Sequence, residues 1–435
     1  MAQIHKNFKT EEVKQLLIWY EDGTMSKADI LKQLDIKDSR FYSLLKSFRK
    51  NPSKFTIDYG RNYTNRRLPD NVVMQIRREL EIDKRLVDNP SMPIMFYNYS
   101  SVRDTVERLT GYNLSAQTVI NYARKWNYYI ERPKKKARHT REVLTTHVGM
   151  LLQHDASLHQ WSPYIKDKRG RPVKWSLITT IDDHSRKILY AELFERESAW
   201  AHIQALESVV VNYGVGIRYY ADNHSIFRYV ARRDQQAHLN RILGTDDVAP
   251  QWKQCVEAVG MKVQYAMSPE AKGKIERPYR WLQDRVVRRS ARENATTIDE
   301  VRRILQHEID RYNNKQVHSS TGEIPNKRFS RAISDSRSCF RPLNLNTTHP
   351  PVASTKDLFC LRAECRVDGY NQISFLGLKL DVPKHLPDGT SVILHVLPNK
   401  QAKTIEIRFV KNDAILGYTT IPNPNSSFSF GMLLF

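Results

Sequence analysis

The first part of the chain carries apolar positions at helical spacing. A helix is predicted over residues 11–21, where the apolar face is formed by Val13, Leu16, Leu17 and Tyr20. A shorter helix is expected over 28–34, and Asp38 is a good N-cap for a last helix through Lys50. Two short helices joined by a tight turn, the second of them basic, form a helix-turn-helix pattern, which we assign to residues 1–54.

A second helical unit is predicted over residues 69–132, after a linker at 55–68. Its last two helices are joined by a turn at Gly111, and Ser115 caps the second of them. This is another helix-turn-helix candidate. The side chains expected to bind DNA are Arg40, Ser43 and Lys46 in the first unit and Gln117, Thr118, Asn121 and Arg124 in the second. Small helical bundles that make no DNA contact are the alternative for both units.

From residue 145 onward, short apolar runs of strand character alternate with helices. Strands are predicted over 148–153, 174–181, 187–194, 216–221 and 261–266. Helices are predicted over 198–213, within 228–258, over 276–292 and over 297–312. The order βββαβαβα is typical of the RNase H-like fold, so we expect an α/β catalytic core over residues 145–330.

The remaining segments are expected to connect or extend this core. A basic linker is predicted over 133–144, and a linker rich in Pro and Asn lies within 331–355. Residues 356–421 alternate apolar and polar positions in short runs, which predicts a small five-stranded β-barrel before an unpatterned tail at 422–435. The predicted fold class is multidomain α+β, with N-terminal helix-turn-helix domains, an RNase H-like α/β catalytic core and a C-terminal small β-barrel.

Composition narrows the class of partner. The chain has 435 residues with a net charge of +22 and a pI near 9.7, which favours a polyanion, nucleic acid ahead of a membrane surface. No apolar stretch approaches the roughly 18 residues of a membrane span, and no signal peptide opens the chain. The four cysteines form no CxxC pair, which argues against a zinc finger. We expect a soluble, intracellular, nucleic-acid-binding protein of three or four domains with no membrane partner.

Three acidic residues stand in contexts that suit metal-dependent chemistry on nucleic acid. Asp155 and Asp222 follow apolar strands, and Glu276 opens a long basic helix. These carboxylates can converge to hold two Mg²⁺ ions, with Asp155 bridging both, because Mg²⁺ prefers hard oxygen ligands. Such a metal pair stabilises charge on the attacking and leaving oxygens of a phosphodiester.

Other polar residues have a competing structural interpretation. Asp182 and Asp183 fit a hairpin turn better than a metal site, and Glu270 is a second choice for the third acid. His154, His159 and His224 could lie near the metals, although packing is the simpler interpretation. Basic residues could bind DNA phosphates or only be solvated. They are Lys134, Lys135 and Lys136 in the basic linker, and Lys272, Lys274, Arg277, Arg280, Arg285, Arg288 and Arg289 around Glu276.

The stretches that carry these acids also carry a family resemblance. Four motifs resemble those of the DDE transposases of bacterial insertion sequences, above all the ISNCY-type group. They are Asp155-Ala156-Ser157, Ile181-Asp182-Asp183-His184-Ser185, Asp222-Asn223-His224-Ser225-Ile226-Phe227 and Lys272-Gly273-Lys274-Ile275-Glu276-Arg277. The same motifs resemble those of the retroviral integrase core more distantly. The resemblance is close over 145–330, but a longer interval before Glu276 implies an insertion near 228–258, and the His/Cys zinc pattern of those integrases is missing.

The resemblance implies a transposase that cleaves DNA at the ends of an insertion sequence and joins the 3′-OH ends to target DNA. Asp155, Asp222 and Glu276 would be the catalytic residues and the ligands of two Mg²⁺ or Mn²⁺ ions per active site. The partners would be double-stranded DNA, as terminal repeats and target, and further copies of the chain in a homodimer or higher oligomer on DNA. The implied location is the bacterial cytoplasm, at the nucleoid. The alternatives are a catalytically inactive DNA-binding regulator of transposition and an RNase H-like nuclease without strand transfer.

Overall fold

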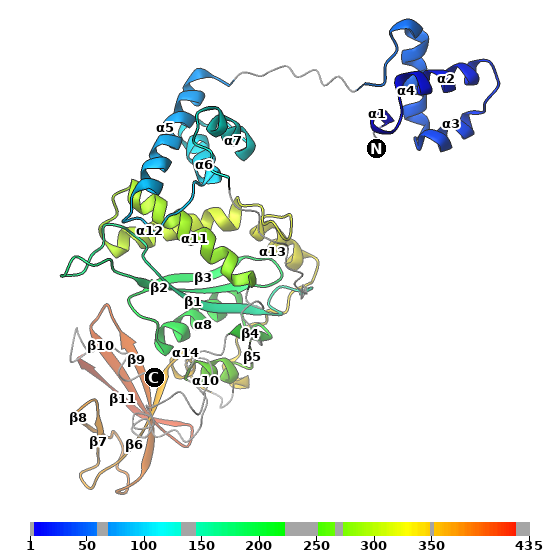
Figure 1. Ribbon diagram of the computed structural model, residues 1–435. Helices are drawn as coiled ribbons and strands as arrows, with labels where there is room; N and C mark the ends of the chain where they lie inside the picture. Colours follow the sequence, from blue (N-terminus) through cyan, green and yellow to red (C-terminus); the bar gives the residue numbers. More distant parts are fainter. Residues whose placement is uncertain are drawn as a thin grey trace. The chain divides into compact units, whose positions relative to one another are not determined.

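In the computed structural model the described residues are 4–58, 68–131, 145–221, 251–265, 273–348 and 352–422, with only the backbone described at Gly273, Lys274 and Glu276. The chain divides into two compact units, Met1–Val73 and Met74–Phe435 (Figure 1). Several predicted site residues lie outside the described ranges: Lys134, Lys135, Lys136, Asp222, His224, Glu270 and Lys272.

The first unit contains the predicted N-terminal helices. They are α2 (Thr10–Glu21), α3 (Lys27–Leu34) and α4 (Asp38–Lys50), and two short elements that were not predicted flank them, α1 (Ile4–Asn7) and the 3-10 turn η1 (Pro52–Lys54). The helices pack through a buried cluster that includes Leu17, Ile30 and Phe41. The predicted N-cap is wrong by one residue, because Lys37 holds the N-cap position and Asp38 is the first helical residue. An acidic side chain there still interacts favourably with the helix dipole.

Three further helices precede the sheet. They are α5 (Asp70–Asp88), α6 (Tyr99–Thr110) and α7 (Ala116–Lys125). α6 ends at Gly111, which adopts a φ of 68° that few residues other than glycine tolerate. The side chain of Ser115 accepts a hydrogen bond from the backbone N–H of Thr118, so the predicted cap of α7 is confirmed. The helices have the order expected of a helix-turn-helix, and their contact with DNA stays a prediction.

A five-stranded sheet forms the centre of the second unit. Its strands are β1 (Leu152–His159), β2 (Trp175–Asp182), β3 (Ile188–Phe194), β4 (Arg218–Ala221) and β5 (Lys262–Tyr265), in the order β3-β2-β1-β4-β5. The first three strands are antiparallel neighbours, and β4 is parallel to both β1 and β5. The predicted end of the first strand is wrong. The ladder between β1 and β2 continues to His159, so Asp155 lies inside the strand.

Helices cover both faces of this sheet (Figure 1). α11 (Gly273–Arg292) and α12 (Ile298–Asn314) share a buried cluster with β2 and β3, while α8 (Ala199–Tyr213) and α10 (Gln251–Ala258) pack against the opposite face. The side chains of Ser198 and Thr297 cap α8 and α12. Within the described part of the chain, no helix has both the length and the apolar character needed to cross a bilayer.

The C-terminal strands differ from the predicted five-stranded barrel. After α13 (Pro325–Ser334), η3 (Leu345–Thr347) and α14 (Thr355–Leu358) come six strands. They are β6 (Leu361–Arg366), β7 (Gln372–Phe375), β8 (Leu378–Asp381), β9 (Ser391–Asn399), β10 (Thr404–Lys411) and β11 (Ala414–Pro422). Four form an antiparallel sheet in the order β11-β10-β9-β6, and β7 pairs only with β8. Because no ladder among the described residues joins β6 to β11, the sheet is open.

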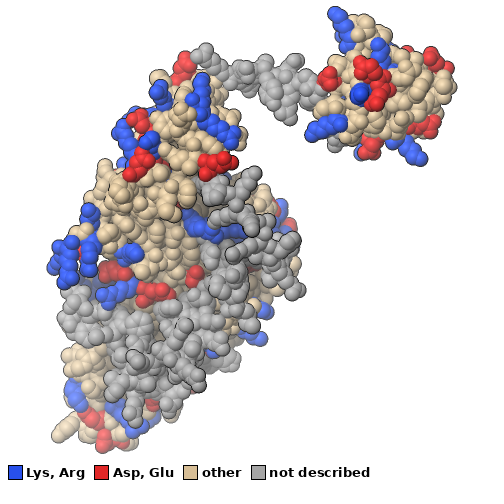
Figure 2. Space-filling view, viewed as in Figure 1, with Lys and Arg blue, Asp and Glu red and all other residues tan. Residues whose placement is uncertain are grey.

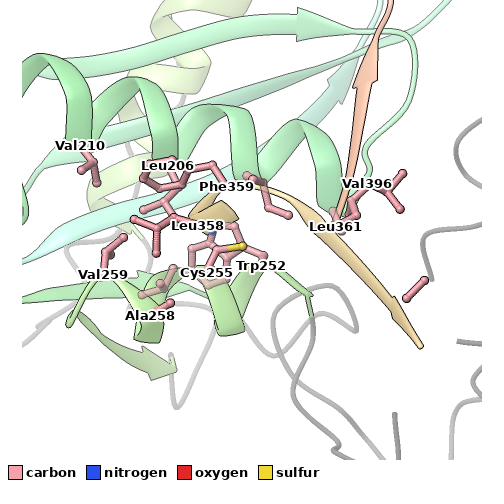
Figure 3. Packing of buried hydrophobic residues seen from close by; sticks show 14 of the residues in the cluster. Leu206, Val210, Trp252, Cys255, Ala258, Val259, Leu358, Phe359, Leu361 and Val396 are labelled. Atoms are coloured by element: carbon pink, nitrogen blue, oxygen red, sulfur yellow. The ribbon is translucent and has the colours of Figure 1, made fainter. Parts of the chain in front are cut away.

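This C-terminal sheet shares a hydrophobic core with the central sheet. Leu206 of α8 and Trp252 of α10 belong to the same buried cluster as Phe359 and Val396 (Figure 3). The segment before it, within the expected linker 331–355, also contacts the central unit. The N–H of Cys339 donates to the carbonyl of Val148 (2.8 Å), and Arg341 exchanges backbone hydrogen bonds with Val215. Buried apolar surface therefore connects the two sheets.

Candidate functional site

Alternation along β1 sorts its polar side chains onto two faces. Gln153, Asp155 and Ser157 point toward the face covered by α11, where the hydroxyl of Ser157 accepts a hydrogen bond from Gln283 (2.8 Å). Thr179 of β2 lies directly opposite Asp155 and therefore on the same face. Its hydroxyl is buried and has no hydrogen-bond partner among the described residues, so a polar group is unsatisfied beside the Asp155 position.

The opposite face of β1 holds a buried histidine pair. The imidazole of His154 is 2.8 Å from both the hydroxyl of Thr180 and a ring nitrogen of His202, and the other ring nitrogen of His202 is 3.1 Å from Glu197. The His154 ring stacks on Trp252 with centroids 5.3 Å apart. His154 therefore packs behind the strand, away from the Asp155 carboxylate. His159 stands against Trp161, and burial lowers its pKa.

Helix α11 brings position 276 to the Asp155 side of the sheet. The hydroxyl of Tyr279 donates to the backbone carbonyl of Asp155, and Gln283 donates to Ser157 one turn later. Residue 276 precedes Tyr279 by three positions and Gln283 by seven, so its backbone lies on the same stripe of the helix. The N-terminal half of α11 thus faces β1 along the stripe that contains the predicted third acid.

The second predicted acid follows immediately after a described strand. The parallel register pairs Gln153 of β1 with Tyr220 of β4, and β4 ends at Ala221. Residue 222 itself lies outside the described residues. Asp155 is the one member of the predicted triad whose side chain is described. Among the described residues no group of three His, Cys, Asp or Glu side chains is placed to hold a metal.

The hairpin aspartates have the contacts of a turn. Asp182 accepts hydrogen bonds from the N–H groups of Gly149 and Ser185 (both 2.8 Å), and burial raises its pKa. Asp183 accepts from Thr145 (2.8 Å), Arg186 (2.9 Å) and Gln153. Both carboxylates are buried. Their observed partners fix the β2–β3 turn and the segment before β1.

Two of the α11 arginines are buried in ion pairs and are not available to DNA. Arg285 pairs with Asp104 of α6, and Arg288 pairs with Asp83 of α5. A third arginine of α11, Arg292, pairs with Glu79 of α5 at 2.5 Å. Sequence reasoning placed Arg285 and Arg288 around the DNA end and missed these partners. The available signal was the spacing of Glu79 and Asp83, which share a helical stripe with the buried Ile76 and Leu80.

Most of the other predicted DNA-binding residues whose side chains are described are exposed. Arg40, Ser43 and Lys46 are exposed on α4, and Gln117, Asn121 and Arg124 are exposed on α7. Thr118 is half-buried, and its hydroxyl is 2.8 Å from that of Ser115, so it supports the cap of α7. On α11, Arg277 and Arg280 are exposed, and Arg277 donates to the hydroxyl of Ser320 (2.5 Å). No structural observation assigns these side chains to DNA.

The hairpin between β1 and β2 carries a basic tip that was not predicted. Its exposed basic residues are Lys166, Lys168, Arg169, Arg171 and Lys174. Asp167 shapes the turn by accepting hydrogen bonds from the N–H groups of Arg169 (2.8 Å) and Arg171 (2.9 Å). Blue side chains gather over this hairpin in Figure 2. The run of four cations within residues 166–171 was the available sequence signal.

Three antiparallel strands followed by two parallel ones, in the order β3-β2-β1-β4-β5 with helices on both faces, define an RNase H-like fold. The chain is similar to transposases of bacterial insertion sequences. A Sinorhizobium fredii protein named "Putative transposase y4bF" is 26% identical over 272 residues, 62% of this chain and 52% of that protein. The transposase for insertion sequence IS1202 of Streptococcus pneumoniae is 28% identical over 202 residues, 46% of this chain and 40% of that protein. The chain therefore matches about half the length of these relatives.

Comparison with solved structures finds retroviral integrases. The HTLV-2 integrase catalytic core domain in complex with magnesium has a TM-score of 0.30 and 14% identity, covering 43% of this chain and 99% of that one. The simian T-cell lymphotropic virus intasome in complex with the PP2A regulatory subunit B56 gamma has a TM-score of 0.34 and 11% identity, covering 74% of this chain and 92% of that one. No model of a known protein family matches the chain.

Proposed function

We propose that this chain is a DDE transposase that binds insertion-sequence ends, cleaves DNA strands and joins the 3′-OH ends to target DNA. The observation that carries the proposal is Asp155, which lies on the central strand of an RNase H-like sheet beneath the stripe of α11 that contains position 276. Similarity to the transposase for insertion sequence IS1202 and to a second protein named as a transposase supports the same activity. The net charge of +22 suits a DNA substrate.

In this proposal Asp155, Asp222 and Glu276 would hold two Mg²⁺ or Mn²⁺ ions, which would stabilise charge on the attacking and leaving oxygens. Three carboxylates are the donor set that such hard cations prefer. The unsatisfied hydroxyl of Thr179 also fits a hydrated ion beside Asp155. The contacts from Tyr279 and Gln283 would fix β1 against α11, so that the acids from strand and helix keep one separation.

The triad is tested by single amide substitutions in the full chain, assayed with a labelled element-end duplex, Mg²⁺ and a target plasmid. Asp155→Asn, Asp222→Asn and Glu276→Gln should each abolish cleavage and joining while leaving end binding largely intact. Asp299→Asn is the control, because Asp299 is an exposed acid on α12. Activity within tenfold of wild type in any triad variant would remove that residue from the proposed ligands.

The same assay separates the alternatives. Specific end binding by wild type without any cleavage would indicate a regulator of transposition, and cleavage without joining would indicate a nuclease. Joining two ends to one target needs two active sites, so we propose a homodimer or higher oligomer on DNA. Light scattering that finds one protein per paired-end complex would contradict that assembly.

A further inference from the structure

A polar cavity of about 130 Å³ lies between the β2–β3 turn and the segment that follows α12. The β2–β3 turn contributes Asp183, His184 and Arg186 to its lining, and the segment after α12 contributes Ser320, Thr321 and Arg328. Arginine guanidinium and hydroxyl groups are donors that oxyanions accept, and arginine can bind an oxyanion through two nitrogens at once. The cavity therefore has the donors of an anion site.

Protein donors already occupy the carboxylates near this cavity. Asp183 accepts hydrogen bonds from Thr145, Gln153 and Arg186. Glu323 pairs with Arg328 at 2.9 Å and with Arg331 at 2.6 Å. These contacts hold the arginines in place and leave the cavity with more positive than negative charge.

The positive charge around the cavity also affects the pKa of a buried histidine beside it. The pKa of His318 is lowered to about 4, first by burial and then by Arg186, Arg277 and Arg328. His318 is therefore neutral at pH 7 and adds no charge of its own. Its ring nitrogen accepts the N–H of Ser320 (3.3 Å), and Arg277 donates to the hydroxyl of the same serine. The three arginines thus act around one small loop, residues 318–321.

The cavity lies on the same face of the sheet as the Asp155 carboxylate. Gln153, two residues before Asp155 and on the same face of β1, donates its amide to Asp183 in the cavity wall. On the other side, Arg277 follows position 276 directly and contacts Ser320. Arg328 of the cavity wall donates to the carbonyl of His184 in the β2–β3 turn (2.9 Å), so polar contacts join the two sides of the cavity and reach the strand of the candidate active site.

We propose that Ser320, Thr321 and Arg328 bind one backbone phosphodiester of the DNA whose reacting linkage is positioned at Asp155, while the buried Arg186 remains paired with Asp183 and adds positive charge behind them. A phosphate contact of this kind fixes the register of a strand without reading its sequence. The assignment rests on the proposed function, because it takes the ligand to be DNA and the adjacent acids to be the reaction centre. It adds a site for a phosphate that does not itself react.

The test couples one protein change to one DNA change. End duplexes are prepared with a single neutral methylphosphonate at each position in turn, and binding is measured with the full chain in EDTA. Wild type should lose about tenfold or more in affinity at one position, the magnitude of a charge-assisted hydrogen bond. Arg328→Gln should bind normal DNA more weakly and show no further loss at that position. Arg331→Gln, on the same helix and paired with the same glutamate, should keep the wild-type profile.

A second variant and a second ligand complete the design. If Arg328→Gln does not fold, the double variant Ser320→Ala/Thr321→Val can be used, because it removes two hydroxyl donors. In this variant, a methylphosphonate at the same position should cause little further loss of affinity. Identical methylphosphonate profiles in wild type and variants would overturn the proposal. So would a His318 resonance, assigned with His318→Gln, that shifts saturably with inorganic phosphate but not with end DNA. The binding assay needs no turnover, so loss of the proposed chemistry with retained coupling is distinguishable from loss of the phosphate site.

Discussion

Replacement of Arg288 by methionine should loosen the contact between α5 and α11. The side chain of Arg288 is 2% exposed and donates to Asp83, to Asp284 (3.0 Å) and to the carbonyl oxygen of Phe96. Methionine keeps much of the buried length but removes every one of these donors. Asp83, also buried, then loses its ion-pair partner while remaining shielded from water.

The expected cost follows from that burial. Removing one member of a buried ion pair costs about 3–5 kcal/mol, because the remaining charge stays desolvated. Since a factor of ten corresponds to about 1.4 kcal/mol, local opening should become roughly two to three and a half orders of magnitude more frequent. Burial already raises the pKa of Asp83 although Arg288 lowers it, so the pKa should rise further in the variant. Protonation then relieves the cost, and the defect should shrink as the pH falls toward 5.

Hydrogen exchange read by mass spectrometry measures the effect in peptides from α6 and the second half of α5. Lys84→Met is the matched control, because the Lys84–Asp88 pair (2.6 Å) is exposed on α5 and should contribute below about 1 kcal/mol. The double variant Asp83→Leu/Arg288→Met should recover most of the protection, since an apolar pair can replace a buried ion pair. Wild-type exchange in Arg288→Met, or a double variant as unprotected as the sum of its single changes, would refute the reasoning.

Two further predictions concern pH and DNA. Because the folded pKa of His318 is about 4 and its ordinary value is 6.5, its neutral form stabilises the fold above pH 6.5. Up to about 3 kcal/mol of stability should be lost as the pH falls from 6.5 to 4. Thermal melts should show a weaker pH dependence in His318→Gln than in the exposed control His385→Gln, and equal slopes would contradict the assignment. Arg40→Ala and Asn121→Ala should each cost roughly 1–3 kcal/mol in binding element ends if the side chain reads a base edge. An equal loss on scrambled duplex in competition experiments would place that side chain on the phosphate backbone instead.

Local signals were sufficient for much of the fold. α8 and α12 each combine a continuous apolar stripe with a capping residue, Ser198 or Thr297, and their predicted bounds match to within two residues. The order of strands and helices across residues 145–312 was predictable for the same reason. The C-terminal topology was not, because alternation identifies strands but does not determine which strands pair. β7 and β8 form a separate two-stranded sheet, and the four-stranded sheet stays open.

Sequence spacing was enough to predict which residues lie on strands or helices near the candidate site. It was not enough to predict contacts that depend on how distant helices pack. That Asp155 lies on a strand could be predicted from its context, although its place inside β1 depends on a ladder with β2 that no local pattern encodes. The arginines of α11 show the larger limit. A basic helix reads as a DNA-binding surface, yet Arg285 and Arg288 meet carboxylates from helices about 180 or more residues earlier in the chain. Whether a cation meets a phosphate or a carboxylate depends on which helix packs against it.

The hydrophobic cluster shared by the two sheets would fix the distance between a DNA contact on the C-terminal sheet and the candidate active site. A module on a flexible tether samples many distances from an active site, whereas a module seated on a common core keeps one. Trp252 and Phe359 lie in that common core, and the backbone of Arg341 is paired with Val215 just before it. If the C-terminal sheet touches DNA, the number of nucleotides between that contact and the linkage at Asp155 would be set by side-chain packing, and lengthening the connecting segment would not change it. The protein would then cleave at a constant number of nucleotides from that contact.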